Sequence, residues 1–302
     1  MQVEQQAPPI AKRSFLSRWT KYALGFTALV FLTALFSNSD KMDFSDRGKI
    51  AVVEVRGVIS DSREIVRQLS EYRKNDKILG VVLRIDSPGG AVAPSQEIFS
   101  EALKLRESAK PIYASMGNLA ASGGYYIASA AERIYANPGS VTGSIGVIMA
   151  FSNVEGLIKK IGVRPEVIKS GKFKDSGSPT RKMTEKEREY LQGVVKDVHS
   201  QFIDAVADSR GLPHEQVKKL ADGRIFTGRQ ALEHKLVDEL GGLELAIEKI
   251  AEKTGIEGDP KIIWEEEEAD LIDILLGKWT RSVQSAASLP TTPSLQFLWN
   301  LN

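Results

Sequence analysis

Three short clusters rich in glycine and serine contain the residues best suited to chemistry. They are Asp86-Ser87-Pro88-Gly89-Gly90, Ala121-Ser122-Gly123-Gly124-Tyr125-Tyr126 and Thr142-Gly143-Ser144-Ile145-Gly146. Each cluster follows or precedes an apolar segment that has the pattern of a buried strand. Loops at the ends of parallel strands are where α/β folds bind their ligands. The clusters are therefore predicted to belong to a binding or catalytic site.

Ser122 is the candidate nucleophile in these clusters. Alanines precede it, two glycines follow it, and a helix is predicted to begin there. The free N–H groups and the dipole at a helix start favour a developing oxyanion, and glycines let a substrate backbone come close. The alternative is that Ser122 only caps this helix, and the cluster alone does not decide between the two.

A serine nucleophile needs a base, and no histidine is placed to act as one. The three histidines have no metal-like spacing and are expected to be exposed helix residues: His199, His214 and His234. A lysine can replace histidine as the base. It works only when neutral, so desolvation must lower its pKa from about 10.4 by roughly 3. Lys172 and Lys174, on the glycine-rich loop 170–179, are the candidates, and composition neither chooses between them nor excludes two solvated surface lysines.

The composition narrows the class of protein. The chain has 302 residues, of which 42% are hydrophobic and 26% are charged, as is ordinary for a folded domain. A net charge of +1 provides no strong field for nucleic acid, so no nucleic-acid partner is expected. The absence of cysteine excludes disulfides, cysteine nucleophiles and thiolate metal sites, but it does not define the compartment.

The N-terminal segment has the pattern of a membrane anchor. Tyr22–Phe36 contains no charge, and all nearby cations precede it, at Lys12, Arg13, Arg18 and Lys21. The run is shorter than the roughly 20 residues of a usual span, although Trp19 and Thr20 could lengthen it. A soluble core helix is disfavoured by the basic flank. A cleaved signal peptide is the second alternative, but residues 37–40 offer no small-x-small cleavage site.

The positive-inside rule gives this anchor an orientation. Residues 1–21 are expected in the cytoplasm, residues 22–37 in the membrane, and the remainder outside.

The remainder of the chain alternates predicted strands with predicted helices. The strands are predicted at Ile50–Val55, Gly80–Ile85, Pro111–Ser115 and Val163–Ile168. The helices are predicted at Asp61–Lys74, Pro94–Ser108, Ser122–Glu132, Leu212–Leu220, Gly228–Lys235, Gly242–Lys253 and, amphipathic, Leu271–Trp279. A capping box over Thr184–Glu187 predicts a further long helix that ends near Ser209. The alternation predicts an α/β fold with a parallel sheet and crossover helices, followed by a loose tail over residues 289–302.

The clusters occur together in an order that resembles the signal peptide peptidase SppA (protease IV) family in its short single-repeat form. The resembling segments are Val81–Gly90, Pro111–Tyr126, Thr142–Ile148, Ser170–Thr184 and Ala221–Gly242. The resemblance covers roughly residues 49–250. It implies a ClpP/crotonase-like peptidase domain over residues 48–255, with residues 256–302 as a C-terminal extension.

The resemblance also implies roles for individual residues. Ser122 is the expected nucleophile and Lys174, which Asp175 follows, the expected general base. Lys172 occupies a variable position of the family motif and drops out. Ser144 is expected to assist the lysine.

The N–H groups of Gly90 and Gly123 are expected to form the oxyanion hole by the same resemblance. Such a site needs neither a metal nor a cofactor.

The expected protein is a membrane-anchored serine endopeptidase that degrades cleaved signal peptides and other short peptides. The resemblance implies a single-pass protein of the bacterial inner membrane, with its catalytic domain outside the cytoplasm. A homo-oligomeric ring with sites shared between subunits is also expected. Two alternatives remain: an acyl-CoA enzyme of the crotonase type, which would not require Lys174, and a catalytically dead membrane scaffold, which the presence of Ser122 and Lys174 disfavours.

Overall fold

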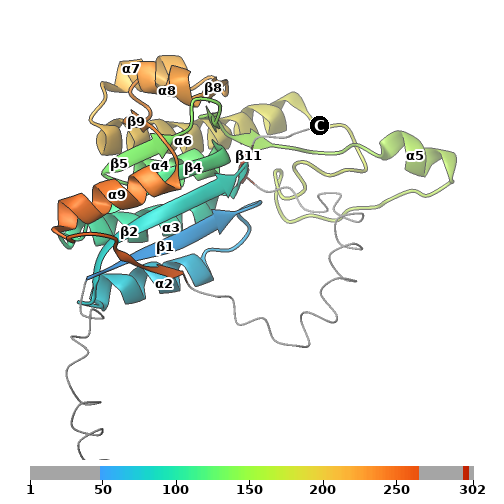
Figure 1. Cartoon of the computed structure of the whole chain (residues 1–302). Coiled ribbons are helices and arrows are strands. Elements are labelled where there is room, and N and C mark those ends of the chain that lie inside the picture. Colours follow the sequence, from blue (N-terminus) through green and yellow to red (C-terminus); the bar gives the residue numbers. More distant parts are fainter. Residues whose placement is uncertain (1–47, 265–294, 299–302) are drawn as a thin grey trace, which may run out of the picture. The chain divides into compact units, whose positions relative to one another are not determined.

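The computed structural model describes residues 48–264 and 295–298, which form a mixed α/β structure around a mostly parallel sheet (Figure 1). The strand order is β10-β1-β2-β4-β5-β9, with β6 beside the end of β4 and β8 beside β6. All pairings in this sheet are parallel except that of β6 with β8. The strands are β1 (Lys49–Arg56), β2 (Ile78–Ser87), β4 (Ile112–Ala121), β5 (Arg133–Ala136), β6 (Val141–Gly143), β8 (Ile225–Thr227), β9 (Glu239–Leu240) and β10 (Lys261–Trp264). The predicted parallel sheet is confirmed.

Within the described part of the chain, eight helices accompany the sheet. They are α2 (Arg63–Lys74), α3 (Val92–Glu107), α4 (Gly123–Ser129), α5 (Glu155–Lys160), α6 (Glu185–Arg210), α7 (His214–Leu220), α8 (Gly228–Glu233) and α9 (Leu243–Thr254). The predicted capping box is present at α6, where Thr184 Oγ1 accepts the Glu187 N–H and the Glu187 carboxylate accepts the Thr184 N–H. The helix ends at Gly211, whose φ of 61° favours glycine.

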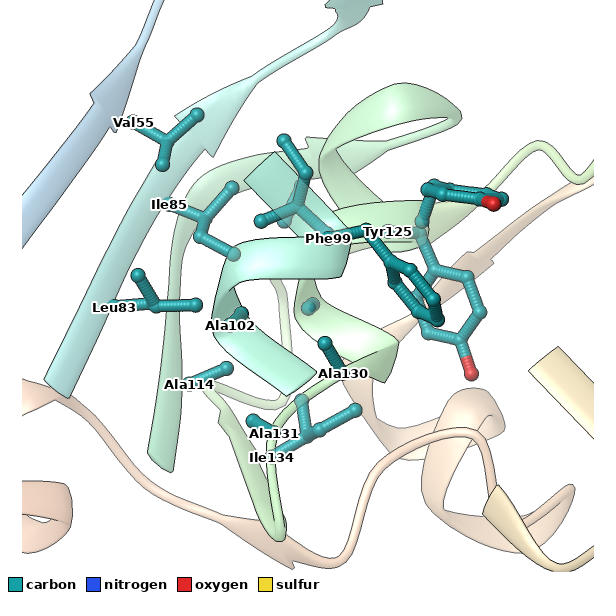
Figure 2. Close-up of a cluster of buried hydrophobic side chains, with 14 of the residues drawn as sticks. Val55, Leu83, Ile85, Phe99, Ala102, Ala114, Tyr125, Ala130, Ala131 and Ile134 are labelled. Atoms are coloured by element: carbon teal, nitrogen blue, oxygen red, sulfur yellow. The ribbon is translucent and has the colours of Figure 1, made fainter. Parts of the chain in front are cut away.

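Apolar side chains of the central strands alternate between two cores, one on each face of the sheet. On β1, Ile50 and Val52 belong to the core beneath α9, whereas Ala51 and Val53 belong to the larger core. Figure 2 shows part of the larger core, in which Ile85 of β2 and Phe99 of α3 take part. A strand that is covered on both faces reads as a continuous apolar run. This burial explains why the sequence pattern of β1 and β2 could be recognised.

A second, antiparallel sheet lies at the end of β2 and contains β3 (Gly89–Ala91), β11 (Leu295–Leu298) and β7 (Ile148–Met149). β11 is the middle strand, so it pairs with both others. The prediction of a loose tail was therefore wrong for residues 295–298. Phe297 explains why these residues form a strand, since its side chain is completely buried against the larger core.

The segment between β7 and α6 extends away from the sheet (Figure 1). Every residue from 161 to 174 is exposed, and the strand predicted at Val163–Ile168 does not form. Pro165 lacks a backbone N–H, and no described strand lies beside this stretch to pair with it. β-branched residues alone were therefore a misleading signal here.

Two predictions concern residues outside the described ranges, namely the anchor at 22–37 and the amphipathic helix at Leu271–Trp279. Among the helices in residues 48–264 and 295–298, none combines the length and the apolar character that crossing a bilayer requires.

Candidate active site

Ser122 and Ser144 follow directly after a pair of hydrogen-bonded neighbouring strands. β4 and β6 pair in parallel with Ala121 opposite Gly143, and each serine is the next residue. The Ser122 N–H donates to the Gly143 carbonyl at 2.8 Å. Both serines are buried in the described chain. The structure thus brings together two residues that are 22 positions apart in the sequence and that were predicted to act together.

The backbone of Ser122 is strained. Its φ is 54° and its ψ is −116°, in a region that residues with a Cβ rarely adopt. Such a conformation costs on the order of 1–3 kcal/mol and is found most often at functional sites. It makes the chain turn sharply from β4 into α4. Other hydrolases present their nucleophilic serine on a strained strand-to-helix turn of this kind.

The side chain of Ser122 does not cap α4. Its Oγ accepts no N–H from the first turn of the helix. A serine that caps a helix normally has an extended backbone and accepts such a bond. The structure therefore contradicts the interpretation of Ser122 as a helix cap, and its hydroxyl remains available.

Gly90 and Gly123 approach each other beside this serine. A Cβ on Gly123 would lie 3.2 Å from the Gly90 nitrogen, and a Cβ on Gly90 would lie 2.0 Å from the Ile59 carbonyl oxygen. Only glycine fits at Gly90 without displacing backbone. Ile59 bonds to the residues on either side, because its N–H donates to Gly89 and its carbonyl accepts from Ala91. The N–H of Gly90 therefore points away from Ile59, toward β11.

Two polar side chains that the sequence analysis did not single out hold these loops in place. Ser87 Oγ donates to the Gly57 carbonyl at 2.6 Å and accepts the Gly89 N–H at 3.1 Å. Thr142 Oγ1 donates to the Ala120 carbonyl at 2.7 Å and so ties β6 to β4. Both belong to the glycine–serine clusters. Their position next to apolar, strand-like segments was the sequence signal that could have identified them.

Lys174 lies on the exposed segment between β7 and α6. Its backbone N–H closes a turn with the Gly171 carbonyl at 3.2 Å, and its side chain is exposed. Within the described residues no hydrogen bond or ion pair links its Nζ to Ser122 or Ser144. The single chain therefore provides no buried environment for a lysine base.

The loop that carries Lys174 is nevertheless well anchored. Phe173 stacks on Tyr190 of α6 with ring centroids 5.0 Å apart. Arg181 donates to the carboxylates of both Asp175 and Glu187, at 3.0 and 2.9 Å. The bond from Arg181, and then that from Lys169, lowers the pKa of Asp175 to about 2, so this carboxylate stays ionised over the physiological range. The residue next to Lys174 is thus fixed in position.

Beside Ser144 is a cavity of about 460 Å³, which is also lined by Ile148, His199, Gly223 and Leu298. His199 is half-buried, and its Nε2 finds no hydrogen-bond partner among the described residues. The expectation of an exposed helix residue was therefore wrong for His199, because α6 turns this side chain toward the site.

Comparison with known proteins gives these residues a family. The sequence model of Peptidase family S49 matches residues 104–257, which include Ser122, Ser144 and Lys174. Gly90 lies before the matched range.

Individual relatives agree with this match. A putative protease of Synechocystis is 43% identical over 255 residues, which are 84% of this chain and 92% of the relative. A putative signal peptide peptidase SppA of Enterococcus faecium is 36% identical and covers 74% of this chain and 71% of the relative. Protease 4 of Salmonella typhi is 31% identical over 88% of this chain, which corresponds to only 44% of that protein.

These matches favour a peptidase over the acyl-CoA enzyme and the inactive scaffold that the sequence left open. The matched range covers half of the chain and includes the loop of Ser122. The chain belongs to Peptidase family S49, and it is an SppA-like serine peptidase.

Proposed function

We propose that this chain hydrolyses peptide bonds with a serine–lysine dyad formed by Ser122 and Lys174. The observation that supports it most is the strained turn that presents the unbonded hydroxyl of Ser122 beside Ser144. Gly90 and Gly123 lie close together beside this turn, since a Cβ on Gly123 would lie 3.2 Å from the Gly90 nitrogen. These groups are the parts that acyl transfer requires: a nucleophile, oxyanion donors and room for a base.

The reaction proceeds in two halves. Lys174, in its neutral form, takes the Ser122 proton as Oγ attacks the scissile carbonyl, and Ser144 orients the lysine. The N–H groups of Gly90 and Gly123 stabilise the oxyanion, and loss of one such donor costs about 3–4 kcal/mol in comparable sites. Lys174 returns the proton to the leaving amine, and water then hydrolyses the acyl-enzyme with Lys174 again as base.

The fold in this proposal is ClpP/crotonase-like, with the peptidase domain over residues 48–255. A parallel sheet whose carboxyl ends carry the glycine-rich loops supports this assignment. The extension, residues 256–302, provides β10 to the large sheet and β11 to the small one. The substrates in this proposal are remnants of signal peptides and other short peptides, in keeping with the printed name of the Enterococcus relative.

The proposal includes a single membrane anchor at residues 22–37, with the catalytic domain outside the cytoplasm. The cations that precede this uncharged run support that orientation. An alkaline phosphatase reporter, active only after export, is expected to be active when fused after Asn302. β-Galactosidase is active only in the cytoplasm. If a β-galactosidase reporter fused at the same position is active and the alkaline phosphatase reporter is not, the orientation is contradicted.

The site is proposed to be shared between subunits of a closed homo-oligomer. The segment between β7 and α6 exposes apolar side chains that a soluble monomer would normally cover: Leu157, Ile161, Val163, Val167, Ile168 and Phe173. A second copy of the chain would bury these side chains and, with them, the exposed Lys174. Because each copy would offer its segment to the next, the contacts would be head-to-tail and would close into a ring.

Complementation tests this arrangement. Ser122→Ala and Lys174→Ala proteins, each inactive, are mixed in detergent under conditions that allow subunits to exchange. Mixed neighbours contain some intact pairs of Ser122 and Lys174, so casein hydrolysis is expected to recover to about a quarter of the wild-type level at an equal ratio.

The control for complementation is the double variant mixed with either single variant. The double variant has neither Ser122 nor Lys174. Its mixture with the Lys174→Ala protein therefore contains no intact pair and should not recover activity. No recovery in the main mixture, together with a monomeric mass by light scattering, contradicts a shared site.

A further inference from the structure

Arg181 lies at the base of the loop that carries Lys174, and each N–H of its guanidinium has an acceptor. Nε donates to Asp175 Oδ2 at 3.0 Å, and Nη2 donates to the Asp175 carbonyl, also at 3.0 Å. Nη1 and Nη2 donate to the two oxygens of the Glu187 carboxylate, and Nη1 donates to the Lys182 carbonyl at 3.1 Å. A guanidinium has five N–H donors in one fixed plane. The five acceptors match that number, so the site suits arginine and not lysine, which has three donors.

The two carboxylates that Arg181 binds belong to different parts of the chain. Asp175 directly follows Lys174, and Arg181 bonds to both its side chain and its main chain. Glu187 is buried in the first turn of the 26-residue helix α6, where its carboxylate also accepts the Thr184 N–H at 2.8 Å. Arg181 therefore connects the main chain beside the proposed base to the start of a long helix.

The other contacts of the loop act at different points. Lys169 donates to the second carboxylate oxygen of Asp175, but Lys169 belongs to the same exposed segment, so this bond does not join the loop to a helix. Phe173 stacks on Tyr190 of α6. This stacking holds the residue before Lys174, and Arg181 holds the residue after it.

The ion pairs of Arg181 persist over the range of pH in which peptidases are assayed. The bond from Arg181 lowers the pKa of Asp175 to about 2 and holds the pKa of Glu187 well below its ordinary value. A carboxylate whose pKa is lowered by folding stabilises the folded state above its ordinary pKa, near 4, and loses this contribution only as the pH falls toward the lowered value. Arg181 thus keeps both partners from about pH 5 upward.

The position of the Lys174 main chain matters because the lysine side chain itself is exposed in the single chain. In the proposed shared site, a second copy must meet this lysine in one orientation. A loop that is ordered beforehand avoids the entropy cost of becoming ordered on association. A displacement of about 1 Å can reduce a catalysed rate by about 10²-fold.

We propose, on the basis of the dyad proposed above, that Arg181 is a positioning residue for the base. Arg181 acts through Asp175: it fixes the main chain next to Lys174 against the start of α6, and so sets the place at which the lysine side chain leaves the loop. Arg181 itself touches neither the substrate nor the reacting atoms in this proposal.

The test compares Arg181→Ala, Asp175→Ala and the double variant in the full chain, with Arg73→Ala as the matched control. The side chain of Arg73 is 29% exposed and bonds to buried Glu101 at 3.1 Å. The side chain of Arg181 is 31% exposed and bonds to buried Glu187 in the same way. Arg73 lies on α2, so its loss removes a similar ion pair without acting on the loop.

Arg181→Ala is expected to lower kcat at least about tenfold and to leave KM within about twofold, because the substrate still binds but the base is displaced. Asp175→Ala should lower kcat to a similar extent. The double variant should be at most about threefold slower than the slower single variant, because both changes break one connection. Arg73→Ala should lower the melting temperature about as much as Arg181→Ala does and keep kcat within about twofold.

Three results overturn the proposal: a folded Arg181→Ala chain with kcat within about twofold of wild type, a loss that falls on KM alone, or losses that multiply in the double variant. Arg181→Lys covers the case in which Arg181→Ala does not fold. It keeps the charge but lacks the planar fork, so kcat is expected to fall at least about threefold. A wild-type kcat in the Arg181→Lys chain also overturns the proposal.

Hydrogen exchange separates a failure of this proposal from a failure of the proposed hydrolysis, since it requires no turnover. The amides of Lys174, Ser176 and Ser178 donate to carbonyls within the loop. They are expected to exchange at least about tenfold faster in Arg181→Ala and at the wild-type rate in Arg73→Ala. Unchanged exchange in Arg181→Ala overturns the proposal. Faster exchange in a protein without peptidase activity refutes the proposed hydrolysis and leaves the fixing of the loop by Arg181.

Discussion

Replacing Ser122 with alanine is expected to reduce the rate of peptide hydrolysis at least about 10³-fold, because Ser122 is the proposed nucleophile that forms the acyl-enzyme. The hydroxyl makes no capping bond, so its removal should leave the fold intact. The melting temperature is expected to stay within about 2 °C of the wild-type value. Steady-state hydrolysis of a fluorogenic peptide and a thermal melt of the same preparation give both numbers.

Ser129→Ala is the matched control for this variant. Ser129 is a buried serine at the end of α4, the helix that Ser122 precedes, and its Oγ donates to the Tyr126 carbonyl at 2.7 Å. Its loss removes one hydrogen bond, worth about 1 kcal/mol, without touching the reaction. It should therefore lower the melting temperature and keep most of the activity. A Ser122→Ala preparation with more than a few per cent of wild-type activity would show that the nucleophile lies elsewhere.

Replacing Lys174 with alanine is the second change with a large expected effect. The loss of the general base should reduce kcat/KM by about 10³-fold, whereas Lys172→Ala should stay within about twofold of wild type. The two lysines lie two positions apart on one exposed loop, so the pair controls for charge and for loop stability.

The outcome that contradicts this role for Lys174 is the opposite ranking, with Lys172→Ala inactive and Lys174→Ala active. The same assays separate a peptidase from an enzyme of the acyl-CoA type, since only the peptidase requires the lysine. Retention of the wild-type mass by both variants in light scattering shows that neither change acts by dissociating the proposed oligomer.

The sequence determined those features that depend on local chemistry. The capping box at Thr184 predicted the start of α6, and the end predicted near Ser209 lies one residue before the observed end at Arg210. A helix start can be read locally because it is satisfied by groups within one turn of it. The apolar runs of β1 and β2 identified buried strands, because both faces of the sheet are covered. The glycine–serine clusters could be placed at strand ends because each one adjoins an apolar segment in the sequence.

The sequence suggested roles for the site residues, which stay predictions, but it did not show how the fold surrounds these residues. Ser122 and Ser144 become neighbours only because β6 pairs with β4, a contact that no local pattern encodes. The burial of His199 against the cavity depends on how α6 rotates when it packs. Lys174 remained on an exposed segment in the single chain.

Tertiary structure alone decided whether residues 163–168 and 295–298 form strands. Residues 163–168 have strand-like composition, yet they remain single because no described strand offers hydrogen bonds beside them. Residues 295–298 look like a loose tail, yet they form the middle strand of a sheet, because Phe297 packs against the rings of Tyr126 and Phe202 and because β3 and β7 both offer an edge for pairing. Backbone hydrogen bonding between strands depends on the partner that is available in space, and a sequence read locally does not contain that partner.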